Sequence, residues 1–107
     1  MAALTIIANI HADLDQIDLV ETELLKLIPV TRAEEGCIQF DLHQGNDNPA
    51  HFSLYETWES RALWTTHMNA PHLQAYVDAT DDAVAQVTLS EMTKIGDDIA
   101  AAEGKTK

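Results

Sequence analysis

Two histidines flank a break in the second half of the chain, and their side chains are suited to proton transfer. His67 and His72 lie on either side of Asn69-Ala70-Pro71, and Tyr76 follows four residues after His72. Imidazole gains and loses a proton near neutral pH, so His67 is a candidate general base. His67 can instead bond a backbone group and hold the break together. Tyr76 shares a helical side with His72, as a pocket hydroxyl or as a packing residue.

A second group of candidate residues lies on predicted strands. Asn9 is a polar amide in the middle of a strand, where such residues are uncommon, and His11 shares its face. Trp58 closes another strand and points the same way as Leu54 and Phe52. An aromatic wall, a base and a few hydrogen-bond donors are enough to hold an electron-rich phenol or quinol and deprotonate its hydroxyl group. The alternatives are core packing for Trp58 and a water-satisfied outward position for Asn9.

Metal, phosphate and hydrolase chemistry have weak signals in this sequence. His67 and His72 are five residues apart, whereas ligands three or four apart align on one helical face. The chain has only four glycines and no glycine-rich phosphate loop. It also lacks the nucleophile elbow of a hydrolase. The sequence therefore predicts neither a metal nor a cofactor.

Hydropathy patterns predict the elements that must position these residues. Alternation indicates strands, and helical spacing of apolar residues indicates helices. We expect Asp13 or Asp15 to cap the first helix, Pro29 to distort it, and Gly36 to follow its end. The predicted strands cover residues 4–12, 37–44, 51–58 and 84–95; the helices lie between about 13 and 35, from 60 to 69, and from 71 to about 83.

The order β-α-β-β-α-β predicts an α+β, ferredoxin-like domain. Helices would cover one face of the sheet, and a second subunit is the expected cover for the other. The 107 residues favour one domain, assigned to residues 1–96, with a tail over 97–107.

Charge and hydropathy limit the possible partners. The chain has 18 acidic and 6 basic residues, a formal net charge of −12. Nucleic acid and anionic membranes would be repelled by such a surface. Cys37 is the single cysteine, so no internal disulfide can form. No stretch approaches the roughly 18 apolar residues of a membrane span, and we expect a cytoplasmic protein.

Three segments, in order, resemble the antibiotic biosynthesis monooxygenase (ABM) family, closest to its quinol monooxygenases. They are Glu35-Gly36-Cys37-Ile38-Gln39-Phe40, then Phe52-Ser53-Leu54-Tyr55-Glu56-Thr57-Trp58-Glu59-Ser60, then His67-Met68-Asn69-Ala70-Pro71-His72-Leu73-Gln74-Ala75-Tyr76. The resemblance covers about residues 4 to 95. It implies a dimeric α+β barrel, formed by a homodimer.

The resemblance also implies an activity: oxidation of a quinol or polyphenol-like aromatic substrate by O₂ without a cofactor. In some family members an asparagine at the position matching Asn9 lines the pocket. Taken with the residue types, the resemblance assigns catalytic roles to His67, Asn9 and Trp58, and pocket positions to Tyr76, His72, His11, Leu54 and Phe52.

The sequence also allows other functions. Haem-degrading members of the family carry an axial histidine after the helix break, where this chain has Tyr76 and Val77. Isomerisation of a phosphorylated molecule is disfavoured because basic residues are few. A non-catalytic dimeric module that binds a small ligand is the remaining alternative. An oxygenase predicts that Asn9, Trp58 and His67 converge on one cavity, whereas a structural module predicts no pocket between sheet and helices.

Overall fold

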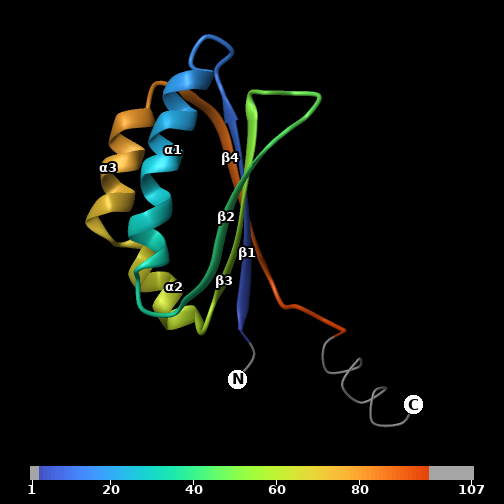
Figure 1. Cartoon of the computed structure of the whole chain (residues 1–107), viewed down its shortest axis with the longest axis vertical. Helices are drawn as coiled ribbons and strands as arrows, with labels where there is room; N and C mark the ends of the chain where they lie inside the picture. The colour runs from blue at the N-terminus through green and yellow to red at the C-terminus, as the bar shows by residue number, and fades with distance from the viewer. Residues whose placement is uncertain (1–2, 97–107) are drawn as a thin grey trace.

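The computed structural model describes residues 3–96, which form four strands and three helices (Figure 1). In chain order they are β1 (Leu4–Ala12), α1 (Ile17–Arg32), β2 (Cys37–Gln44), β3 (His51–Trp58), α2 (Arg61–Met68), α3 (Pro71–Thr80) and β4 (Val84–Met92). The predicted order is confirmed, although α3 and β4 each end three residues earlier than expected. The predicted tail, residues 97–107, lies outside the described residues.

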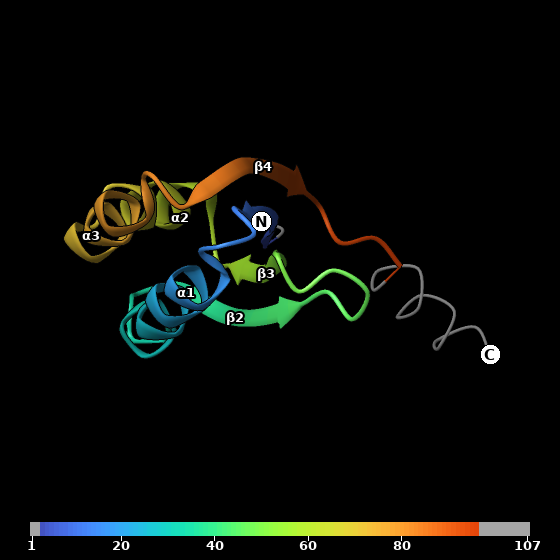
Figure 2. The ribbon, with the colours of Figure 1, turned by 90° about the horizontal axis from the view of Figure 1, so that it is seen from above.

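The four strands form one antiparallel sheet in the order β2-β3-β1-β4. All three helices lie on the same side of this sheet (Figures 1 and 2). This is the α+β, ferredoxin-like arrangement that the sequence predicts. Within residues 3–96, no helix covers the second face of the sheet. The odd-numbered side chains of β1 lie on this face, because the even-numbered ones (Ile6, Ala8 and Ile10) are buried in the core.

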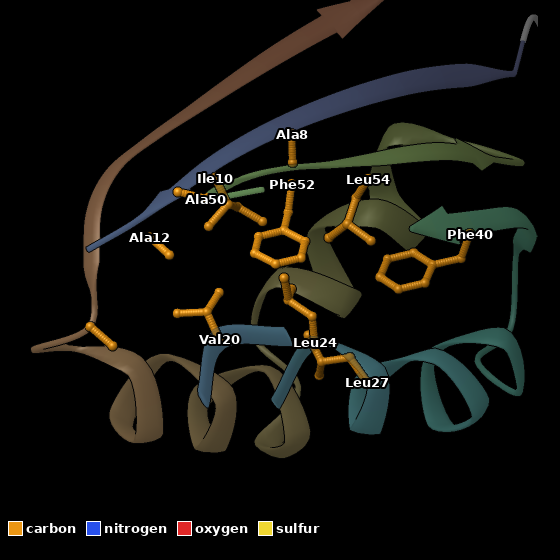
Figure 3. Close-up of a cluster of buried hydrophobic side chains, with 11 residues drawn as sticks. Ala8, Ile10, Ala12, Val20, Leu24, Leu27, Phe40, Ala50, Phe52 and Leu54 are labelled. Atoms are coloured by element: carbon orange, nitrogen blue, oxygen red, sulfur yellow. The ribbon is translucent and has the colours of Figure 1, made fainter. Parts of the chain in front are cut away.

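The core fills the layer between sheet and helices because strand alternation and helical spacing each produce one apolar face. From the sheet, Phe52, Leu54 and Phe40 point toward α1, where Leu24 and Leu27 meet them (Figure 3). All five side chains are buried. A smaller cluster of Leu4, Ile6 and Trp58 continues the core at the end nearest α2.

The start of α1 differs from the prediction. Its N-cap is Gln16, with no side-chain cap bond, so capping by Asp13 or Asp15 is wrong. The backbone N–H of Asp13 instead bonds the carbonyl of Ala83, which extends the β1–β4 pairing past the strand end. The carbonyl of Asp13 then accepts from Gln16 N–H in a turn, and the helix begins only after that turn.

Pro29 lies inside α1, and the helix continues through it to Arg32. A proline removes one backbone donor, so the helical bond to the carbonyl four residues earlier is lost, and only three helical residues follow Pro29. The helix therefore ends close to the predicted boundary despite the proline.

Gly36 joins α1 to β2 in a conformation that favours glycine, with φ of +86°. A Cβ at this position would lie 2.4 Å from Leu63 Cδ1. The Gly36 carbonyl also accepts a hydrogen bond from the backbone N–H of Glu59, 2.8 Å away. Glycine at position 36 thus allows the segment that leads into β2 to pack closely against the start of α2.

The Gly36→Ala substitution should lower the free energy of unfolding by about 2–4 kcal/mol, because it combines left-handed strain with a clash. Urea denaturation measures the change. In the double variant Gly36→Ala, Leu63→Ala the contacts with Leu63 Cδ1 and Cγ are removed and only the one with Cβ remains, so the clash is reduced and the loss should be smaller than the sum of the single losses. A double loss equal to that sum would show that the clash contributes nothing.

Candidate active site

A partly open pocket of about 150 Å³ lies between the sheet and the helices. Most of its lining is apolar, with His67, Glu56 and Tyr76 as the exceptions. Its rim includes Met68 and Val77, both exposed. The full lining is Ala8, Ile10, Leu27, Phe40, Leu54, Glu56, His67, Met68, Leu73, Tyr76, Val77, Val87 and Leu89. The site is therefore an apolar cavity with few polar groups, as small-molecule sites usually are.

His67 is the histidine of the pocket wall. It lies in the last turn of α2, whose N-cap Ser60 accepts a hydrogen bond from Leu63 N–H. Its side chain is almost fully buried, and its ring packs against Trp58, with centroids 4.7 Å apart. Phe40 approaches the same ring edge-on at 5.9 Å. Aromatic contacts on two sides therefore fix the orientation of the imidazole.

Glu34 holds the two histidines together. Its Oε2 atom lies 2.6 Å from His67 Nδ1 and 2.7 Å from His72 Nε2. A carboxylate only accepts hydrogen bonds, so both of these nitrogens carry a proton. In a neutral His67 the lone pair is then on Nε2, and within residues 3–96 this nitrogen has no hydrogen-bond partner. Glu34 therefore selects the tautomer that leaves Nε2 basic.

Glu56 is a pocket residue that was not among the predicted site residues. The pKa of its carboxyl is raised to about 7, chiefly by burial. The negative charge of Glu34 also raises this pKa, whereas the 2.9 Å hydrogen bond from Trp58 Nε1–H lowers it. A signal was present in the sequence. Glu56 falls on the apolar side of the β3 alternation, between Leu54 and Trp58, and a carboxyl there requires a partner.

The predicted site residues Leu54, Tyr76, Phe52 and Trp58 lie between the sheet and the helices, at or near this pocket. Leu54 and Tyr76 line it, and burial raises the pKa of the Tyr76 hydroxyl. Phe52 is a core residue beside Leu54. Trp58 is fully buried behind His67 and does not line the cavity, so it acts on the pocket through its contacts with His67 and Glu56.

Asn9 and His11 lie on the opposite face of the sheet. The Asn9 Oδ1 atom accepts hydrogen bonds from His51 Nε2 at 2.8 Å and from Ser53 Oγ at 2.6 Å. The His11 ring stacks on His51 with centroids 4.5 Å apart. The predicted convergence of Asn9 with Trp58 and His67 is therefore wrong within one chain, because β1 points its odd-numbered side chains away from the helices. Trp58 and His67, which were predicted to lie together, do contact each other through their rings.

His72 lies close to His67 although the two residues are five positions apart. The break at Asn69-Ala70 ends α2 and starts α3 in a new direction, so the two histidines are on different helices. The spacing argument against a shared ligand applied to a single helix and does not hold here.

The fold and the pocket define an α+β, ferredoxin-like protein with an apolar pocket between its sheet and its helices. The chain belongs to the antibiotic biosynthesis monooxygenase family, whose model matches residues 3–79. Within residues 3–96, no helix is both long and apolar enough to cross a membrane. No curated protein matches the sequence.

Solved structures share this fold over nearly their whole length. PA3566 from Pseudomonas aeruginosa is 29% identical with a TM-score of 0.86; the match covers 90% of this chain and 97% of that one. A structure described as an antibiotic biosynthesis monooxygenase is 28% identical with a TM-score of 0.82, covering 87% and 99%. Rv0793 from Mycobacterium tuberculosis is 24% identical, with a TM-score of 0.83, and covers 90% and 98%.

Proposed function

We propose that the protein is a cofactor-independent monooxygenase that oxidises a small quinol or polyphenol with O₂ in the pocket beneath the helices. The observation that carries the proposal is the His67 imidazole, held by Glu34 through Nδ1 in the wall of an apolar cavity. The family supports monooxygenase chemistry in general. A homodimer and a cytoplasmic location belong to the same proposal, on the sequence arguments given above.

The chemistry needs a base and a dry pocket. His67 Nε2 takes a proton from the quinol hydroxyl, and the resulting anion is electron-rich enough to pass electrons to O₂. One oxygen atom enters the ring and the other leaves as water, so that a quinol and O₂ give a hydroxyquinone and H₂O. The substrate supplies all four electrons. Apolar walls keep bulk water from the reactive anion.

The cavity size limits the substrate. An apolar cavity of about 150 Å³ is large enough for one aromatic ring of benzene size. Fused polycyclic substrates would need the rim residues Met68 and Val77 to move. We therefore favour monocyclic quinols over polycyclic ones.

Oxygen uptake by the purified, metal-free protein tests the proposal, with a protein-free blank for autoxidation. Uptake should exceed the blank with monocyclic quinols and be slower with fused-ring quinols. The Ala8→Leu variant adds three carbons to the cavity without touching His67 or Glu56, and it should raise KM at least about tenfold. Uptake equal to the blank across the panel, or full activity in Ala8→Leu, would contradict this assignment.

A non-catalytic module for small ligands is the second candidate. One observation favours it: Asn9, expected at the pocket of an oxygenase, lies on the other face of the sheet. This candidate predicts that quinols bind in the pocket and quench the fluorescence of nearby Trp58 without any oxygen uptake. Binding without turnover would select it.

A further inference from the structure

Three ligand-type atoms converge beside the pocket. Glu34 Oε2, His67 Nδ1 and His72 Nε2 all lie within 4.8 Å of one another, the one group of this kind within residues 3–96. They come from three segments: the α1–β2 connection, the end of α2 and the start of α3. Tertiary packing, not local sequence, therefore brings them together.

The surroundings of this cluster keep its ligand atoms in place. The rings of Trp58 and Phe40 pack against His67, which is 2% exposed. The side chain of Glu34 is 15% exposed and that of His72 is 24% exposed, so the opposite side of the cluster is open to solvent. The arrangement combines one fixed interior ligand with an entry path for an ion, as a metal site requires.

We propose that Glu34, His67 and His72 form a binding site for a divalent transition-metal ion of the zinc type. Two imidazole nitrogens and one carboxylate oxygen are a donor set that Zn²⁺ binds, with the fourth tetrahedral position left to water on the open side. The ion would take the place of the two protons that now bridge the nitrogens to Glu34, and each neutral ring would then carry its proton on its other nitrogen. The net charge of −12 favours cation binding further.

Metal binding requires the two separations from Glu34 Oε2 to widen and the two nitrogens, which lie within 4.8 Å of each other, to settle at the spacing of zinc ligands. Zinc ligands at about 2.0–2.1 Å from a tetrahedral ion lie roughly 3.3 Å from each other. The present separations from Glu34 Oε2 are 2.6 and 2.7 Å. His72 is the ligand that can move to reach these distances, because it is partly exposed at the start of its helix.

One consequence rests on the proposed function. A metal on Nδ1 of a neutral His67 leaves the ring proton on Nε2, which can then no longer accept a proton from a quinol. Metal binding and base catalysis by His67 therefore exclude each other, and Zn²⁺ should inhibit quinol oxidation at saturating concentration. The binding itself does not depend on that activity.

Titration of the metal-free full chain with Co²⁺, followed by visible absorption, and with Zn²⁺, by competition with a chromophoric chelator, tests the site. We expect one ion per chain. Glu34→Gln and His72→Ala should each weaken binding at least roughly 100-fold, since even outer-shell changes cost 10–100-fold. His51→Ala is the matched control: it alters the histidine pair on the opposite sheet face and should leave the affinity unchanged.

Two results would overturn the site: no saturable binding up to millimolar metal, or binding lost in His51→Ala and retained in His72→Ala. Far-UV circular dichroism of each variant shows whether it is folded. If His72→Ala does not fold, Glu34→Gln tests the site instead, because glutamine has the same shape as glutamate. Binding at one ion per chain without any oxygenase activity would support the site and reject the proposed function. Binding without inhibition of an active enzyme would support the site and reject His67 as the base.

Discussion

Replacing His67 with glutamine should lower kcat for quinol oxidation about 10²–10⁴-fold, with little change in KM. Glutamine can still hydrogen-bond to Glu34, but it has no basic nitrogen to accept the substrate proton. The cavity keeps its apolar walls, so binding of the ring should persist. Steady-state oxygen uptake over a range of quinol concentrations separates the two parameters.

The matched variant is His72→Gln. It replaces the imidazole of the second partner of Glu34 but leaves the 2.6 Å bond between Glu34 and His67, so kcat should fall by less than about tenfold. Thermal unfolding of both variants shows whether lost activity is lost structure. If His67→Gln is as active as the unaltered protein, the base is elsewhere, and Glu56 becomes the next residue to test.

Replacing Glu56 with glutamine should stabilise the protein at pH 8 to 9 and leave its stability nearly unchanged at pH 4. Burial raises the pKa of Glu56 from 4.5 to about 7, so the folded state holds this proton more tightly than the unfolded chain. Its contribution to stability is present below about pH 4.5 and is lost as pH rises through about 7. Glutamine mimics the neutral carboxyl and can still accept the hydrogen bond from Trp58.

The expected gain at high pH is about 3 kcal/mol, since each pKa unit corresponds to about 1.4 kcal/mol. Urea denaturation at pH 4 and at pH 8.5 measures it. Glu59→Gln is the control, because Glu59 is exposed in the segment that follows β3 and its removal should have the same small effect at both pH values. Equal effects of Glu56→Gln at the two pH values would show that the carboxyl is not held neutral by burial.

Most of the fold could be predicted from the sequence because local residue patterns indicate its strands and helices. Strand alternation gave the bounds of β1, β2 and β3, and Ser60 and Pro71 marked the starts of α2 and α3 as expected. Helix capping at α1 was missed, because the backbone of Asp13 is held by Ala83, far away in the sequence. Single-sequence patterns do not report such long-range backbone bonds.

The candidate site was predicted only in part. Residue types identified His67, Tyr76 and Leu54, and all three line the pocket. Asn9 was grouped with them although strand alternation already put it on the other face from Ala8 and Ile10. Face assignment by alternation is reliable, but which face meets the helices is decided by packing.

Sequence alone determined the order of elements, the acidic surface and the chemical types available, because these depend on composition and on spacing within about ten residues. Tertiary structure decided which of those types meet. Glu34 became part of the site through a contact across 33 positions, with His67. Glu56 bonds Trp58 only two positions away, and it joined the site because packing placed its face of β3 against the pocket. The reason is physical: a buried carboxyl must find a donor, and only the packed fold determines which donor lies within about 3 Å.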